Sequence, residues 1–134
     1  MSATTRRVAL MFLALQGLLV GAWALAWPRS FYTDFPGFDH HWTAVTGPYN
    51  EHFVTDVGAA YLALSAAAVL ALAWADVRTS RLVGAIWAAF SAPHLYFHVR
   101  HLDGLTTFDK AGQLTSLSVT LVVALCLALP SKSR

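Results

Sequence analysis

The stretch Val8–Trp27, VALMFLALQGLLVGAWALAW, contains no charged residue over 20 consecutive positions. An α-helix needs about 20 apolar residues to cross a hydrocarbon layer about 30 Å thick, so this stretch predicts a transmembrane helix. Three more apolar stretches follow, at roughly residues 54–75, 82–99 and 111–129. The sequence therefore predicts an all-α bundle of four transmembrane helices, with spans at about 8–27, 54–75, 82–99 and 111–129.

The composition supports this class. Of the 134 residues, 57% are hydrophobic and only 12% are charged, which lies outside the range of soluble globular domains. The apolar stretches are continuous in Leu, Ala and Val and do not alternate with polar residues, which argues against a β-barrel. A net charge of +2 is too small to indicate nucleic acid as a partner. We expect a single integral membrane domain over residues 1–134, with the lipid bilayer as its surroundings.

Basic residues are distributed unevenly between the two sides of the predicted bundle. Six lie on the side that holds both termini: Arg6, Arg7, Arg78, Arg81, Lys132 and Arg134. Three lie on the opposite side: Arg29, Arg100 and Lys110. Because cytoplasmic loops carry an excess of Lys and Arg, this pattern predicts that both termini are cytoplasmic and that the chain is a multi-pass protein of the cytoplasmic membrane.

A long connection between the first two spans begins at Pro28, which we expect to end the first helix. It is rich in aromatic residues: Phe31, Tyr32, Phe35, Phe38 and Trp42. A loop of this length in so small a bundle is typical of a lid or a binding segment. Its aromatic side chains are equally typical of a belt at the membrane surface. On the predicted topology this loop is extracytoplasmic.

Three histidines lie in the segment Ser91–Asp103, SAPHLYFHVRHLD, at the end of the third span. His94, His98 and His101 are spaced i, i+4 and i+7, which places them on one face of a helix. On the predicted topology all six histidines and six of the seven acids lie in the extracytoplasmic half. Chemistry or binding is therefore expected in that half of the bundle.

One hypothesis is a metal site. Its candidate ligands are Glu51, His52, Asp56, His94, His98 and His101. Imidazole and carboxylate ligands suit zinc, iron or copper, with haem as a less favoured cofactor. The three histidines of the third helix span about 10 Å along its axis, which is hard to satisfy around one ion. Either one pair of them would bind the ion together with residues of the second helix, or there would be two ions.

A metal-free alternative uses Asp56 and His98 as a catalytic pair. A depth estimate from the short turn between the second and third helices places Asp56 about one turn above His98. A carboxylate inside a membrane helix needs a partner, and a neutral imidazole is an effective acid or base near neutral pH. Asp56 is therefore expected to face the bundle and to pair with a histidine of the third helix.

A structural alternative is that these groups only hold helices together. In that case the chain would be an accessory subunit, with the aromatic loop and the Gly17/Gly21 pair as docking surfaces for a second copy or a membrane protein partner. Small residues four positions apart let helices approach closely. Packing inside the bundle is the favoured use of Gly17 and Gly21.

Several motifs together resemble a group of small uncharacterised four-helix bacterial membrane proteins that are DoxX-like in size and hydropathy. They are GPYNEH at residues 47–52, Asp56, Gly58, Pro93-His94, His98 and HLDG at residues 101–104. The resemblance implies a four-helix bundle with a long first outer loop, and it implies no substrate. Cys126 is the only cysteine, so the cysteine pairs of quinone-linked thiol oxidoreductases are absent and that activity is not implied.

The sequence thus predicts an integral membrane protein with a His/carboxylate pocket on its extracytoplasmic side. The leading interpretation is a metal-binding protein, or an enzyme, that takes a small lipophilic molecule from the bilayer or the outer face. The competing interpretation is the non-catalytic accessory subunit. Whether a reaction takes place, and which one, stays open.

Overall fold

The computed structural model describes residues 1–130. Within them it has five helices: α1 (Ala3–Ala26), α2 (Pro28–Asp34), α3 (Glu51–Trp74), α4 (Val77–Arg100) and α5 (Thr107–Ala128). A short antiparallel hairpin pairs β1 (Pro36–Gly37) with β2 (His40–His41), and a 3₁₀ turn, η1 (Ala44–Thr46), follows it. Four of the helices, α1, α3, α4 and α5, are long and apolar enough to cross a membrane. The predicted all-α fold with four apolar helices is confirmed, and it indicates a multi-pass membrane protein.

Each long helix begins a few residues before its apolar stretch, because a polar side chain caps it there. Ser2, Asn50, Asp76 and Thr106 each accept a hydrogen bond from the backbone N–H three residues ahead. These bonds satisfy N–H groups that the first turn of a helix leaves free. The bond from the backbone N–H of Thr79 also lowers the pKa of Asp76 below its ordinary value. The polar caps extend the helices beyond the apolar stretches from which they were predicted.

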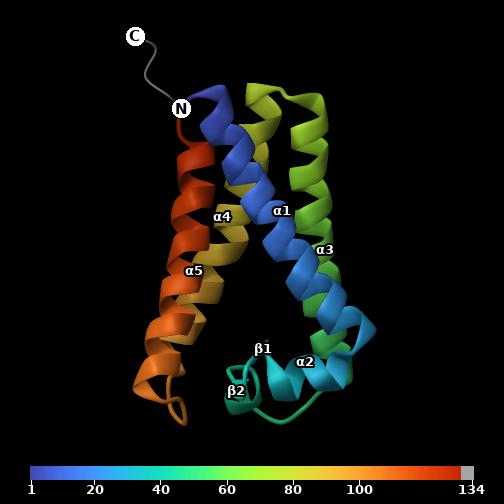
Figure 1. The fold of residues 1–134 in the computed structure, drawn as a ribbon, viewed down its shortest axis with the longest axis vertical. Helices are drawn as coiled ribbons and strands as arrows, with labels where there is room; N and C mark the ends of the chain where they lie inside the picture. The colour runs from blue at the N-terminus through green and yellow to red at the C-terminus, as the bar shows by residue number, and fades with distance from the viewer. Residues whose placement is uncertain (131–134) are drawn as a thin grey trace.

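The four long helices are arranged as two close pairs (Figure 1): α1 packs along α3, and α4 packs along α5. Glycines allow both approaches. A Cβ atom added to Gly17 would lie 2.9 Å from the carbonyl oxygen of Tyr61, and one added to Gly84 would lie 2.6 Å from the Cβ of Leu127. Gly21 is likewise buried against α3. The prediction that Gly17 and Gly21 pack inside the bundle is confirmed.

The two pairs meet at one end of the molecule and diverge toward the other (Figure 1). The large side chains that are fully buried lie in the half nearer the chain termini: Leu10, Leu13, Trp87 and Leu127. Trp87 also donates a hydrogen bond from Nε1 to the carbonyl oxygen of Leu64, which joins α4 to α3 at 3.2 Å. At the opposite end the segment that connects α1 to α3 lies between the diverging pairs.

This connecting segment, residues 27–50, is more ordered than a loop. Pro28 does not terminate the helical course of the chain. Helix α1 ends at Ala26, and Pro28 is the first residue of α2. At that position a helix makes no hydrogen bond from the backbone N–H, so the missing N–H of proline is tolerated. The hairpin that follows turns at Phe38 and Asp39, both with positive φ, as a tight two-residue turn requires. The segment therefore has a defined shape and can close a cavity.

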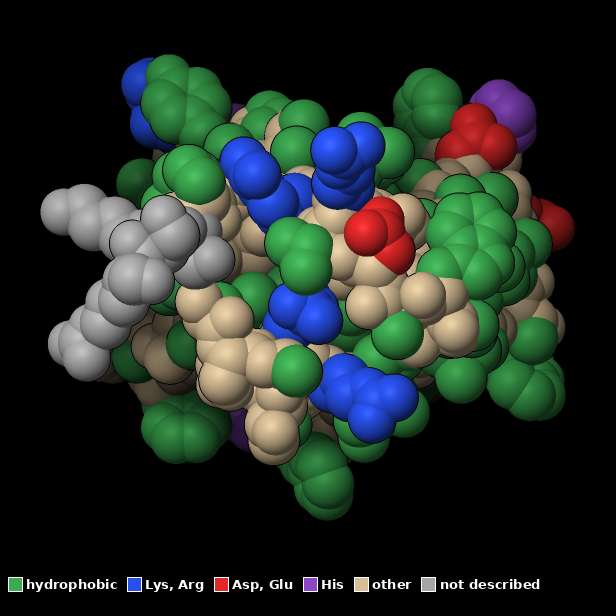
Figure 2. All heavy atoms as spheres, turned by 90° about the horizontal axis from the view of Figure 1, so that it is seen from above, with side chains coloured by type: hydrophobic (Ala, Val, Ile, Leu, Met, Phe, Trp, Pro, Cys, Tyr) green, Lys and Arg blue, Asp and Glu red, His purple; other side chains and the backbone are tan. Residues whose placement is uncertain are grey.

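Basic side chains gather at the end where the helix pairs meet. Figure 2 looks onto this end, and basic side chains (blue) cluster in the middle of the view beside an acidic side chain. Arg7, Arg78 and Arg81 are exposed at the starts of α1 and α4. Lys132 and Arg134, which the predicted orientation also counts among the cytoplasmic basic residues, lie outside the described residues.

Candidate ligand cavity

A cavity of about 750 Å³ lies at the end of the bundle where the helix pairs diverge. All four long helices and the connecting segment contribute to its walls. The lining residues are Phe12, Gln16, Leu19 and Val20 from α1; Phe31, Tyr32, Phe35, Pro36, Trp42, Thr43, Thr46, Gly47, Pro48 and Asn50 from the connecting segment; Phe53, Val54, Val57 and Tyr61 from α3; His94, Phe97 and His98 from α4; and Gln113, Ser116, Leu117, Val119 and Thr120 from α5. Its volume is that of a site for a small organic molecule.

The cavity wall is mostly apolar, and it reaches the outside of the bundle on two sides. Leu19 of α1 and Val119 of α5 line the cavity and are also exposed, as are Phe53 of α3 and Phe97 of α4. These are the two helix combinations, α1 with α5 and α3 with α4, that pack less extensively than the close pairs. In a membrane, apolar residues exposed on the flanks of a bundle face lipid. Exposed apolar residues that would face lipid therefore border the cavity on two sides of the bundle.

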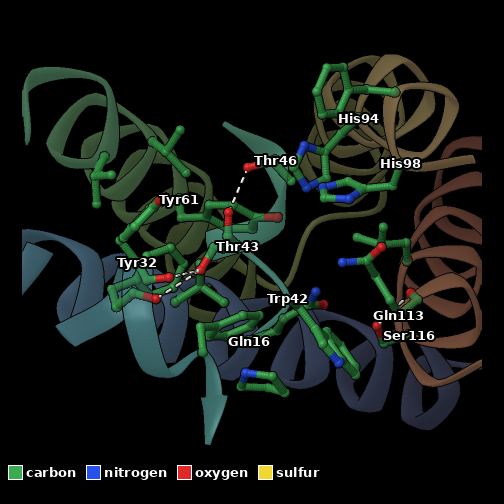
Figure 3. Close-up of a pocket in the computed structure, with 18 of the residues that line it drawn as sticks. Gln16, Tyr32, Trp42, Thr43, Thr46, Tyr61, His94, His98, Gln113 and Ser116 are labelled. Atoms are coloured by element: carbon green, nitrogen blue, oxygen red, sulfur yellow. Dashed lines mark hydrogen bonds between the residues drawn. The ribbon is translucent and has the colours of Figure 1, made fainter. Parts of the chain in front are cut away.

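A polar patch interrupts this apolar wall. His94 and His98 extend from α4, and Gln113 extends from α5 toward the same part of the cavity (Figure 3). The rings of the two histidines are 4.7 Å apart between centroids and nearly perpendicular. His94 also stacks on Phe90, with the ring centroids 5.4 Å apart. Both imidazoles are thus held in place by neighbouring rings.

Two atoms of this polar patch have no hydrogen-bond partner. Nδ1 of His98 and Oε1 of Gln113 are buried, and neither makes a hydrogen bond to any described residue. Two other polar groups around the cavity are bonded. Oε1 of Gln16 accepts a hydrogen bond from the hydroxyl of Thr120, and the hydroxyl of Tyr32 donates to the carbonyl oxygen of Gly47. The His98 and Gln113 atoms therefore stand out as places where a bound molecule can make a polar contact.

The connecting segment is fastened to the start of α5. Nε1 of Trp42 donates a hydrogen bond to Oδ1 of Asp109 at 2.9 Å, and Nδ1 of His40 lies 2.6 Å from the same oxygen. The ring of His40 stacks on Phe108. The second carboxylate oxygen of Asp109 accepts a hydrogen bond from Thr106, the cap of α5. These contacts, which we call the Trp42–Asp109 latch, hold the segment across the end of the cavity.

Of the histidines predicted on the third helix, His94 and His98 line the cavity and His101 does not. His101 is exposed just beyond the end of α4, where its ring stacks on Phe97 at 4.0 Å. Its Nδ1 lies 2.8 Å from the carbonyl oxygen of Phe97. The structure therefore brings together two of the three aligned imidazoles.

The candidate residues on α3 are outside the cavity. Glu51, His52 and Asp56 are exposed. The ion pair of Asp56 is with His52, one turn earlier on the same helix, at 3.4 Å. Among residues 1–130, no ion pair joins Asp56 to a histidine of α4. The predicted meeting of Asp56 with His98 is thus not found, because Asp56 lies on the outer face of α3.

The described part of the chain contains no group of three or more His, Cys, Asp and Glu side chains placed to hold a metal ion. The six residues predicted as ligands separate into the His94/His98 pair, the exposed His52/Asp56 pair, Glu51 and His101. Zinc, iron or copper binding by this set gains no support from the arrangement.

Four residues that shape the site were not among the sequence candidates: Gln16, Trp42, Asp109 and Gln113. The chain has only two glutamines, and both lie within apolar spans. An amide in a membrane helix is costly unless it is bonded, which is the signal that would have selected them. The Trp42–Asp109 pair joins residues 67 positions apart, and no local pattern indicates such a contact.

Comparisons of the chain with protein-family models, with curated proteins and with solved structures found no match. Only the four long apolar helices therefore support the resemblance to DoxX-like proteins.

Proposed function

We propose that this chain is a multi-pass protein of the cytoplasmic membrane that binds a small lipophilic molecule in the cavity between its helix pairs. The observation that carries the proposal is the cavity itself. It is about 750 Å³ in volume, has mostly apolar walls, and holds a buried polar patch at His98 and Gln113. Sites for small organic molecules have this combination of apolar walls and a few polar groups.

Entry from the bilayer is part of the proposal. Exposed apolar residues line the cavity on two sides, Leu19 with Val119 and Phe53 with Phe97. A lipophilic molecule already dissolved in the membrane can pass between helices there without meeting water. In this proposal the connecting segment, fastened by the Trp42–Asp109 latch, would separate a bound molecule from the aqueous side.

The proposed orientation follows the basic residues. The end where the helix pairs meet carries Arg6, Arg7, Arg78 and Arg81, and the positive-inside rule makes that end cytoplasmic. The cavity and its latch would then lie in the extracytoplasmic half. In a catalytic form of this proposal, His98 would act as the acid or base on the bound molecule, since its ring is buried in the cavity wall.

Photolabelling in bilayers tests the binding proposal. The purified chain is reconstituted and exposed to a small apolar diazirine, such as adamantyl diazirine, and the labelled residues are mapped by mass spectrometry. We expect saturable labelling of cavity residues such as Val20, Val57 and Leu117. Leu117→Trp, which places a larger side chain in the cavity wall, should reduce this labelling.

Leu125→Trp is the matched control, because Leu125 lies on the same helix, is exposed, and is outside the cavity. It should leave the saturable labelling unchanged. Labelling confined to lipid-facing residues, with no saturation and no effect of Leu117→Trp, would reject the binding proposal and leave the accessory-subunit interpretation in its place.

A further inference from the structure

The two unpartnered atoms in the cavity wall specify what kind of polar group a ligand must carry. Nδ1 of His98 and Oε1 of Gln113 belong to different helices, α4 and α5, and both side chains point into the same region of the cavity (Figure 3). His98 is about 9% exposed and Gln113 about 3%. Both atoms are too deeply buried to hydrogen-bond with water outside the bundle. A buried polar atom without a hydrogen-bond partner lowers the stability of the folded protein.

Two other polar side chains of the cavity wall are bonded to the protein. Gln16, an amide in the same cavity, is bonded to Thr120 across the bundle at 2.9 Å. Trp42 is bonded to Asp109. Because the Gln16 amide and the Trp42 N–H are bonded, the unpartnered Nδ1 of His98 and Oε1 of Gln113 mark the position of a ligand's polar group.

The chemistry of the two side chains narrows that group. A primary amide presents an acceptor oxygen and a donor NH₂, and a neutral imidazole nitrogen is a donor or an acceptor according to its tautomer. A hydroxyl has one donor and two acceptor positions, so a single hydroxyl satisfies both side chains in every combination of tautomer and amide orientation that presents at least one donor N–H. A ketone or an ether only accepts. An ammonium group only donates, and it would carry a charge into an apolar cavity.

We infer that the cavity binds a lipophilic alcohol or phenol, with its hydroxyl at the His98–Gln113 wall and its apolar body along the residues that lead to the lipid. This inference rests on the proposed function and names the ligand class for the same site. The apolar path from the polar patch runs past Phe97 on one side and past Leu117 and Val119 on the other. One hydroxyl matches the single polar patch, and a long apolar body matches the remaining wall.

A matched series of probes tests the ligand class. Tritiated 1-dodecanol and tritiated dodecane are each measured for saturable binding to the nanodisc-reconstituted chain, with empty nanodiscs subtracted. Unlabelled 1-dodecanol, 1-methoxydodecane and dodecane then compete. We expect 1-dodecanol to compete at concentrations about tenfold lower than the ether or the hydrocarbon, since the ether cannot donate and the hydrocarbon can do neither.

Two variants locate the effect. Gln113→Leu should weaken 1-dodecanol binding about tenfold and leave dodecane binding unchanged, because it removes the amide and keeps the apolar volume. Leu125→Trp is the control: Leu125 lies on the same helix as Gln113 and outside the cavity, so 1-dodecanol should keep its advantage over dodecane.

The outcomes separate the two proposals. If neither tracer binds saturably, the binding function itself is wrong and the ligand class falls with it. If both tracers bind and the three competitors are equally potent, the binding function stands and the alcohol inference is overturned. The competition series on the unaltered chain decides this even if a variant fails to fold.

Discussion

The two ends of this bundle solve the problem of helix contact in different ways. Near the chain termini the helices touch through glycine and through fully buried large side chains, as Gly84 does against Leu127 and Trp87 against Leu64. At the other end the α1–α3 pair separates from the α4–α5 pair, while the two members of each pair stay together, and the cavity and the connecting segment occupy the space. Lipid is as apolar as leucine, so no hydrophobic force closes such a gap; close packing must hold helices together. At one end the helix pairs are therefore in close contact, and at the other they leave room for the cavity.

The largest expected effect is a loss of free energy of unfolding when the packed end of the bundle is altered. Gly84→Ala at the packed end should destabilise the chain by about 3 kcal/mol, since its new Cβ would meet Leu127 and the backbone of Ala128 at 2.6 and 2.7 Å. Denaturation in mixed detergent micelles measures this.

Gly112→Ala is the counterpart at the open end. Its Cβ would lie 3.0 Å from the ring of Trp42, a side chain that can shift, so the cost should stay below about 1 kcal/mol. Equal losses at Gly84 and Gly112 would show that the two ends do not differ in packing.

The next effect concerns the latch. Trp42→Phe keeps an aromatic ring and removes the N–H that binds the carboxylate of Asp109. Hydrogen bonds to charged groups are among the stronger ones, so amide exchange in residues 36–46 should accelerate about tenfold or more. Trp74→Phe, at an exposed position near the packed end, should leave that exchange unchanged. Exchange that is insensitive to Trp42→Phe would mean that other contacts hold the segment.

A smaller effect has the opposite sign. Gln113→Leu should stabilise the empty protein by about 1 kcal/mol, because it replaces an unpartnered buried amide with an apolar group of similar size. The same detergent titration measures it, with no added ligand. A loss of stability instead would indicate that the Gln113 amide is bonded in the empty protein.

The smallest effect is expected at Asp56. Its pairing with His52 is exposed and lies within one helix, so Asp56→Asn should change stability by less than about 0.5 kcal/mol. Binding of 1-dodecanol should not change either. A large loss of 1-dodecanol binding would mean that Asp56 takes part in the site, and it would contradict the outward-facing position of this side chain.

The fold could be predicted from the sequence because its signals are local. Four apolar stretches of membrane length give four helices, and Ser2, Asn50, Asp76 and Thr106 cap their starts. The first helix ends just before Pro28, as predicted, but helix α2 was not predicted, since a proline that ends one helix is equally suited to begin the next. The close packing of Gly17 and Gly21 also follows from their spacing.

The site could be predicted only in part because it depends on how helices face each other. Helical spacing correctly grouped His94 with His98. A depth estimate along the axis placed Asp56 near them in height, but it carries no information on rotation, and Asp56 faces outward. Gln113 and Gln16 were passed over because the sequence argument weighed groups that titrate, whereas the site is completed by neutral amides.

The central claim is that the open end is a binding site for one small lipophilic molecule. The most direct measurement is native mass spectrometry of the chain released from detergent after incubation with excess 1-dodecanol. We predict one bound dodecanol per chain for the unaltered protein and for Leu125→Trp, and fewer for Leu117→Trp, whose larger side chain narrows the cavity. The same number of bound molecules in all three proteins would contradict it.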